Sequence, residues 1–196
     1  GYYYFSKNKT ETPYVCKDCN VILITMTTLR YDHISMNGYF RPTTPNLDKF
    51  AKESNVFDNV FSHASWTAAV RASLYSGLYP FEHEQHGYTG LRVGGFFSEF
   101  PQEIPVFIDV LKKVGYTTAA FRGYYFLPSR FDVLGDCLPG EESIKLPSDR
   151  YRNKGSINFM EFSCTIPRAL AWLKKNSSEK FFMHIQGHDL HCPYSQ

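Results

Sequence analysis

Short apolar runs punctuate this chain, and each is rich in β-branched or aromatic residues. The runs at 20–26, 117–121 and 180–185 are typical of strands in a parallel sheet. The first run, NVILITM, is continuous, which predicts a fully buried, central strand. A shorter run at 56–61 predicts one further strand that leads into the next helix.

Between these runs, apolar positions recur at helical spacing. One helix is predicted over 45–54, where Thr44 can serve as the cap. A second is predicted to start at Thr67 and to end at Gly77 in a left-handed conformation. Two more are predicted over 104–114 and about 163–175. Because strands and helices alternate, the pattern predicts an α/β fold with a central, mostly parallel sheet covered by helices on both faces.

Other stretches lack this periodicity. Residues 1–18 are predicted to form an extended N-terminal arm, followed by one α/β domain over 19–196. Residues 81–103 are loop-like, and residues 122–159 carry many Gly, Pro, Ser and charged residues, which predicts a long surface excursion.

The composition excludes several classes of partner. The net charge is +2, from 21 basic and 19 acidic residues, which does not favour a nucleic acid or an anionic membrane as partner. No apolar run approaches the roughly 18–20 residues of a membrane span. The first residue is not Met, so the start is either a tag remnant or a processed leader, and the second predicts export to a periplasmic, extracellular or lumenal compartment.

Five cysteines give only a weak signal of function. Cys16 and Cys19 form one C-x-x-C pair, but a second pair that would complete a four-cysteine zinc site is missing. We expect structural thiols or one local bridge.

The helix that begins near Thr67 is the first candidate for chemistry. Its start offers unpaired N–H groups and the positive end of the helix dipole, and Arg71 lies one turn further along the same face. A hydroxyl and a guanidinium so placed can hold a sulfate or phosphate ester. The alternative is an ordinary buried helix in which Thr67 is only the cap.

Two other segments converge on this helix if the strands are parallel. Thr27 and Thr28 follow the first strand, and residues 188–191 follow the last one. In open α/β sheets, ligands bind at the carboxyl ends of the strands. These segments, in this order and spacing, resemble the N-terminal part of the catalytic domain of the sulfatases, in the alkaline phosphatase superfamily. The resemblance lies in NVILIT (20–25), LRYDH (29–33), RPTTPNLD (41–48), SWTAAVRASLYSGLYP (65–80), KVGYTTA (113–119) and HDLHCPY (188–194).

The resemblance implies a metal-assisted hydrolase that acts on a small anionic ester, a sulfate or phosphate monoester. It implies catalytic roles for Thr67, Arg71 and His191, and contacts with the substrate from His188, Arg71 and His191. It also implies a divalent cation, Ca²⁺ or Mg²⁺, near Thr27 and Thr67, because an unassisted hydroxyl is a weak nucleophile at neutral pH.

Several positions depart from the family pattern of Cys/Ser-x-Pro-x-Arg. Thr67 stands where the family has a Cys or Ser that becomes formylglycine, and Ala69 replaces the proline, so no formylglycine is expected. Some phosphotransferase relatives use an unmodified Thr there. Thr27 stands where the family has a metal-binding Asp, and a neutral hydroxyl is a poor ligand for a hard dication.

The resemblance also predicts an incomplete domain. The lysine that sulfatases carry after the strand at 117–121 is absent, with Arg122 near but out of register, and later metal ligands have no counterpart before Gln196. One possibility is that a second chain or a further C-terminal segment completes the site. Two functions therefore remain open: an ester hydrolase with weak or absent activity, or a catalytically degenerate binding or scaffold protein.

The remaining polar candidates favour structural roles. His83 and His86 are expected to be structural, Asp32 to stabilise its loop with His33, and Asp189 to orient the loop that carries His188.

Overall fold

The fold is built on a parallel sheet, seen here in a computed structural model that describes residues 18–84, 100–121, 130–135 and 162–191. Within those residues the sheet has four strands in the order β1-β4-β2-β3. Every neighbouring pair is parallel, as expected. The strands are β1 (Val21–Met26), β2 (Thr117–Phe121), β3 (Val133–Leu134) and β4 (Phe181–Gly187).

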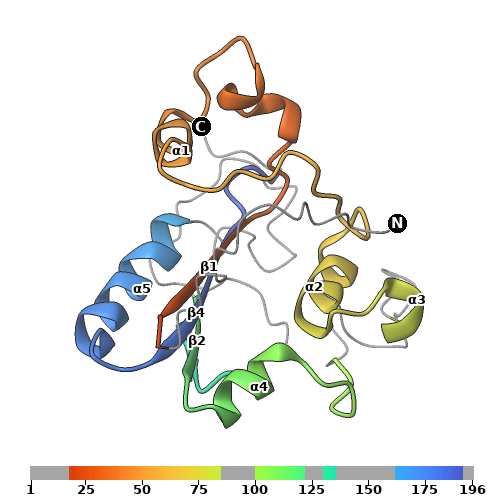
Figure 1. The fold of residues 1–196 in the computed structure, drawn as a ribbon, viewed down its shortest axis with the longest axis vertical. Coiled ribbons are helices and arrows are strands. Elements are labelled where there is room, and N and C mark those ends of the chain that lie inside the picture. Colours follow the sequence, from red (N-terminus) through yellow and green to blue (C-terminus); the bar gives the residue numbers. More distant parts are fainter. Residues whose placement is uncertain (1–17, 85–99, 122–129, 136–161, 192–196) are drawn as a thin grey trace, which may run out of the picture.

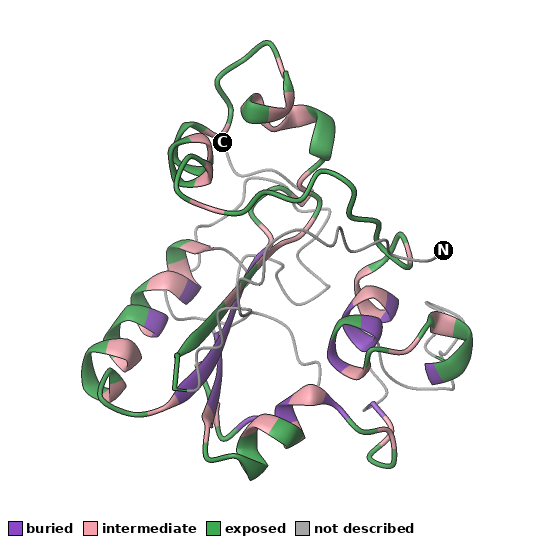
Figure 2. Cartoon of the chain, in the orientation of Figure 1, coloured by how far each residue is buried: buried purple, intermediate pink, exposed green. Residues whose placement is uncertain are grey.

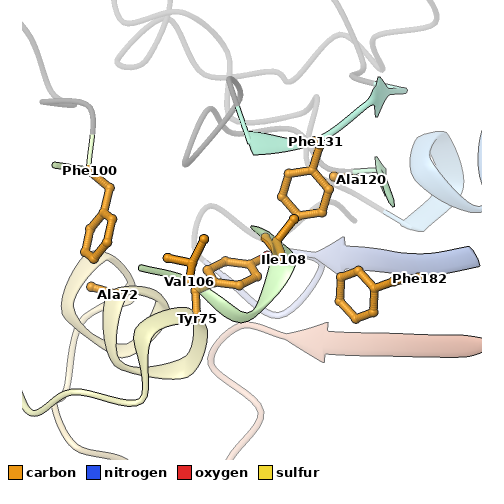
Figure 3. Close-up of a cluster of buried hydrophobic side chains, with 8 residues drawn as sticks. All are labelled: Ala72, Tyr75, Phe100, Val106, Ile108, Ala120, Phe131 and Phe182. Atoms are coloured by element: carbon orange, nitrogen blue, oxygen red, sulfur yellow. The ribbon is translucent and has the colours of Figure 1, made fainter. Parts of the chain in front are cut away.

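Helices cover both faces of the sheet, as Figure 1 shows. Helix α5 (Phe162–Asn176) packs on one face, and α2 (Thr67–Ser76) and α4 (Phe107–Lys113) lie on the other. Successive side chains of a strand point to opposite faces of the sheet, so β4 contributes side chains to the helix layers on both faces. Phe181, Met183 and Ile185 pack under α5. Phe182 joins the aromatic cluster on the α2 and α4 side (Figure 3), which contains Ala72, Tyr75, Phe100, Val106, Ile108, Ala120, Phe131 and Phe182.

The expectation that residues 20–26 form a central, fully buried strand is wrong. Among the described strands β1 is at the edge of the sheet, and Ile22 and Ile24 are 46% and 59% exposed. The inner strands are β4 and β2, and all seven residues of β4 are buried. An apolar run therefore located a strand correctly, but not its place in the sheet.

Two further strand expectations need correction. Residues 56–61 form no strand, and Phe57 and Phe61 are about four-fifths exposed, because no neighbouring strand lies beside them in the described part of the chain. Conversely, β3 lies within 122–159, where only a surface excursion was expected. Residues 1–17, 85–99, 122–129, 136–161 and 192–196 lie outside the described residues, and with them His86, Arg122 and most of the predicted arm and loops.

The helices begin and end close to the predicted places. Helix α1 spans Pro45–Ala51, and α4 starts later than predicted because Pro105 disfavours helical geometry at Ile104. A short helix, α3 (Pro80–His83), begins the segment 81–103 that was expected to be loop. Two 3-10 turns, η1 (Tyr31–His33) and η2 (Ser35–Asn37), follow β1. Figure 2 shows that the segment from η1 to α1 is mostly exposed, whereas β2 and β4 are mostly buried.

Helix α2 has the left-handed end that the sequence predicts, with φ of +73° at Gly77. Its cap, however, is Trp66, and Thr67 is the first helical residue with no capping hydrogen bond from a side chain. The expectation that Thr67 is the cap of this helix is therefore wrong.

Among the described residues, Cys19 and Cys164 are each part of a disulfide bond. No helix among the described residues is long and apolar enough to cross a membrane.

Candidate anion site

The carboxyl ends of β1 and β4 lie side by side. Met26 pairs with Gly187, and the pairing continues one step further because the backbone N–H of Thr27 donates to the carbonyl of Gly187 at 3.0 Å. Thr27 follows Met26 and His188 follows Gly187. The Thr27 hydroxyl and Nε2 of His188 are joined by a hydrogen bond of 3.3 Å. Parallel pairing thus brings together two segments 161 residues apart.

Helix α2 lies along β4 in the opposite direction. Tyr75 hydrogen-bonds Nδ1 of His184, and Arg71, four residues earlier on the helix, hydrogen-bonds the carbonyl oxygen of the Gln186 side chain, two residues later on the strand. Four helical residues rise about 6 Å and two strand residues about 6.6 Å, so the two spacings match. The helix therefore presents Arg71, and then Thr67 at its N-terminus, toward the carboxyl end of β4.

Arg71, Gln186, Thr27 and His188 form a continuous chain of hydrogen bonds. The Arg71 guanidinium donates to Gln186, whose amide nitrogen donates to the Thr27 hydroxyl at 3.1 Å. That hydroxyl is the one that contacts His188. Arg71 is only 7% exposed, so its charge is held in a largely dry environment where interactions with an anion are strong.

The loop after β4 brings two histidines together. The ring centroids of His188 and His191 are 6.0 Å apart, and the backbone N–H of His191 donates to the carbonyl of His188 at 2.8 Å. Burial, with the positive charge of Arg71 and the nearby His191, lowers the pKa of His188 to about 4. His188 is therefore neutral at pH 7, beside an arginine that is always charged.

The low pKa of His188 makes the stability of the fold depend on pH. The pKa is about 4 in the folded state against about 6.5 in the unfolded state, so only the unfolded state gains a proton between these values. We expect the contribution of His188 to the free energy of unfolding to be lost as the pH falls from 6.5 to 4. Urea denaturation across this range, for the wild type and for His188→Asn, measures the difference. Parallel curves for the two proteins would contradict the shift.

The structure brings together four of the five site residues that the sequence suggested: Thr27, Arg71, His188 and His191. Thr67 starts the same helix and is half-buried, but its hydroxyl makes no hydrogen bond to this group within the described residues. Gln186 was missed, because a glutamine inside an apolar strand carries no motif. Its signal was the polar alternation of His184, Gln186 and His188 along an otherwise apolar run.

A divalent cation does not fit the donors at this strand end. The hydroxyl of Thr27 is engaged by Gln186 and His188, and that of Thr28 donates to the Thr27 carbonyl at 2.7 Å. Ca²⁺ and Mg²⁺ prefer carboxylate and carbonyl oxygens, and Thr67 offers only another neutral hydroxyl. Nowhere in the described ranges do three or more His, Cys, Asp or Glu side chains gather in a way that could hold a metal.

The remaining candidates have structural partners. His83 is 1% exposed and its Nε2 lies 3.0 Å from the Ser73 hydroxyl, which ties α3 to α2. Asp32 accepts hydrogen bonds from Arg30 and lies 3.0 Å from Nδ1 of His33 within the loop after β1. Asp189 accepts from the backbone N–H of Phe162 at the start of α5.

Comparison with known proteins identifies the family. The sulfatase family model matches residues 19–196, so the chain belongs to the sulfatase family. It is 28% identical over 106 residues to the N-acetylgalactosamine-6-sulfatase of Mus musculus and 35% identical over 111 residues to an arylsulfatase of Clostridium perfringens. These matches cover 50% and 57% of this chain but 20% and 22% of the relatives, so the matched part spans only about a fifth of their length.

Solved structures agree on the fold. A protein solved in complex with its substrate D-glucosamine-2-N,6-O-disulfate superposes with a TM-score of 0.71 at 20% identity, covering 91% of this chain and 36% of that one. A 2-O GAG sulfatase superposes with a TM-score of 0.66 at 20% identity, covering 88% and 35%. The α/β architecture with a parallel sheet is therefore that of the sulfatases.

Proposed function

We propose that this chain forms the anion-binding part of a sulfatase-type site and holds a sulfate monoester between Arg71, His188 and His191, beside Thr67. The observation that carries the proposal is the buried Arg71, which is hydrogen-bonded to β4 near the carboxyl ends of β1 and β4. A guanidinium offers two parallel N–H groups to a tetrahedral oxyanion, and the ring N–H groups of the two histidines supply further donors.

The organic part of the ester is a saccharide in this proposal. Two lines of support are the relatives named N-acetylgalactosamine-6-sulfatase and the structural neighbour bound to a disulfated glucosamine. A phosphate monoester has the same tetrahedral shape, so sulfate and phosphate must be compared directly. The disulfide-bonded Cys19 and Cys164 support an exported protein, because disulfides persist in oxidising compartments.

Hydrolysis is expected to be weak or absent in the chain as it stands. The position of the metal-binding Asp is taken by Thr27, whose hydroxyl is already hydrogen-bonded, and the nucleophile position by Thr67. This donor set also supports the second candidate, a degenerate family member that binds its ligand without turnover. Restoring Asp at position 27 alone should not create activity, because Thr28 and Thr67 would still offer only neutral hydroxyls to a cation.

Calorimetric titration with N-acetylgalactosamine 6-sulfate, its 6-phosphate and the unsulfated sugar tests the binding proposal. We expect the sulfate ester to bind and the unsulfated sugar not to bind. Equal binding of all three, or none, would contradict the proposal.

Assays with 4-nitrophenyl sulfate test the chemistry. We expect little or no turnover, unchanged in Thr67→Ala. A fast rate that Thr67→Ala abolishes, together with stoichiometric bound Ca²⁺ or Mg²⁺ by metal analysis, would instead establish an active enzyme.

A further inference from the structure

Gln186 lies at the centre of the chain of hydrogen bonds between α2 and the sheet. It belongs to the inner strand β4 and is 2% exposed. Its side-chain oxygen accepts from Arg71, and its side-chain nitrogen donates to Thr27 at 3.1 Å. One amide thus contacts a residue of the helix and a residue of the neighbouring strand at the same time.

The direction of the first two hydrogen bonds in this chain follows from Arg71. A guanidinium can only donate, so the oxygen of the Gln186 amide must face it and the nitrogen must face Thr27. The Thr27 hydroxyl accepts from that nitrogen, and its own proton can then be donated to Nε2 of His188, which lies 3.3 Å away. A neutral imidazole that accepts at Nε2 carries its proton on Nδ1.

We propose that Gln186 is a positioning residue that prepares two anion-binding side chains together: it holds the Arg71 guanidinium in place and, through Thr27, sets His188 in the Nδ1–H tautomer. The inference rests on the anion-binding function proposed above. Donors that are already oriented lose little side-chain freedom when the ligand binds, so this arrangement favours affinity. The two Thr27 contacts also occupy the place at the end of β1 where the family resemblance expects a cation ligand.

Two substitutions separate the two contacts of the amide. Gln186→Glu keeps an acceptor for Arg71 but cannot donate to Thr27, so the Thr27 hydroxyl turns to donate to the new carboxylate. Nε2 of His188 must then donate to Thr27, and the imidazole changes to the Nε2–H tautomer. Gln186→Met removes both hydrogen bonds while keeping the length of the side chain.

Nitrogen-15 NMR of the imidazole ring of His188, in the anion-free protein at pH 7, measures the tautomer directly. We expect the Nδ1–H form in the wild type and the Nε2–H form in Gln186→Glu. In Gln186→Met we expect the affinity for inorganic sulfate to fall about tenfold to a hundredfold, as expected for charge-assisted hydrogen bonds that lose their orientation.

Thr25→Val is the matched control. It removes a hydroxyl that lies 2.9 Å from Nε2 of His184, two residues before Thr27 on the same strand, so it perturbs the same part of the fold. We expect this variant to keep both the tautomer of His188 and the affinity for sulfate. If it lost either, the effects of the Gln186 substitutions would reflect only a disturbance of this part of the fold.

The outcomes separate this inference from the proposed function. An Nε2–H tautomer in the wild type, or an Nδ1–H tautomer retained in Gln186→Glu, overturns the role of Gln186 whether or not an anion binds. Failure of the wild type to bind sulfate or a sulfated sugar overturns the proposed function, while the tautomer measurement still decides what Gln186 does.

Discussion

Replacement of Arg71 by Met is expected to weaken the binding of sulfate esters at least about a hundredfold. A charge-assisted hydrogen bond contributes about 1.5–3 kcal/mol, and a guanidinium can make two of them to one oxyanion. Because Arg71 is buried, solvent does not compensate the bound anion for the loss of the guanidinium charge. Calorimetric titration with the sulfated sugar measures the change in affinity.

Two variants control this measurement. Arg71→Lys keeps the charge but loses the two-pronged geometry, so we expect an intermediate loss. Arg168→Met is the same substitution on α5, where the guanidinium donates to the carbonyl of Cys164 on the opposite face of the sheet, and it should leave binding unchanged. If Arg71→Met binds as the wild type does, Arg71 does not contact the anion.

Truncation of Phe182 to Ala is expected to cost about 3–5 kcal/mol of the free energy of unfolding. Phe182 lies on the inner strand β4, is 2% exposed, and packs edge-on against Phe107 with ring centroids 5.2 Å apart and stacks on Phe131 at 6.4 Å. Such a loss is a large part of the roughly 5–15 kcal/mol that stabilises a typical domain. The midpoint of urea denaturation, followed by circular dichroism, measures it.

Phe50→Ala is the control for this prediction. The side chain of Phe50, on α1, is 70% exposed, so the same truncation should change stability by no more than about 0.5 kcal/mol. A cost below about 1 kcal/mol for Phe182→Ala would show that the cluster around Phe182 does not hold the sheet to α2 and α4.

Local chemistry made much of this fold predictable. Gly77 marked the end of α2 because its φ of +73° is costly for other residues, and the apolar runs marked β1, β2 and β4 because such runs suit a buried sheet. The order of the strands was not predictable in this way. The residues of the run at 20–26 do not indicate which strand pairs with it, so the pairing with β4 could not be predicted from them.

The limits of prediction at the site have the same origin. Thr27, Arg71, His188 and His191 were expected together because parallel strand ends converge, and the structure brings these four together. Gln186 was not expected, because its role depends on partners 115 and 159 residues away in sequence. The run at 56–61 misled for a related reason, since apolar residues form a strand only when another strand is beside them.

The pairing of β1 with β4 has a consequence for how the protein is made. The first strand of the described fold hydrogen-bonds a strand that begins 160 residues later in the chain. During synthesis, β1 must wait until nearly all of these 196 residues have left the ribosome before its partner exists. Contacts of such long sequence separation slow folding. The nascent chain therefore carries an apolar segment, VILITM, that stays without its partner strand until synthesis of this part of the chain is almost complete.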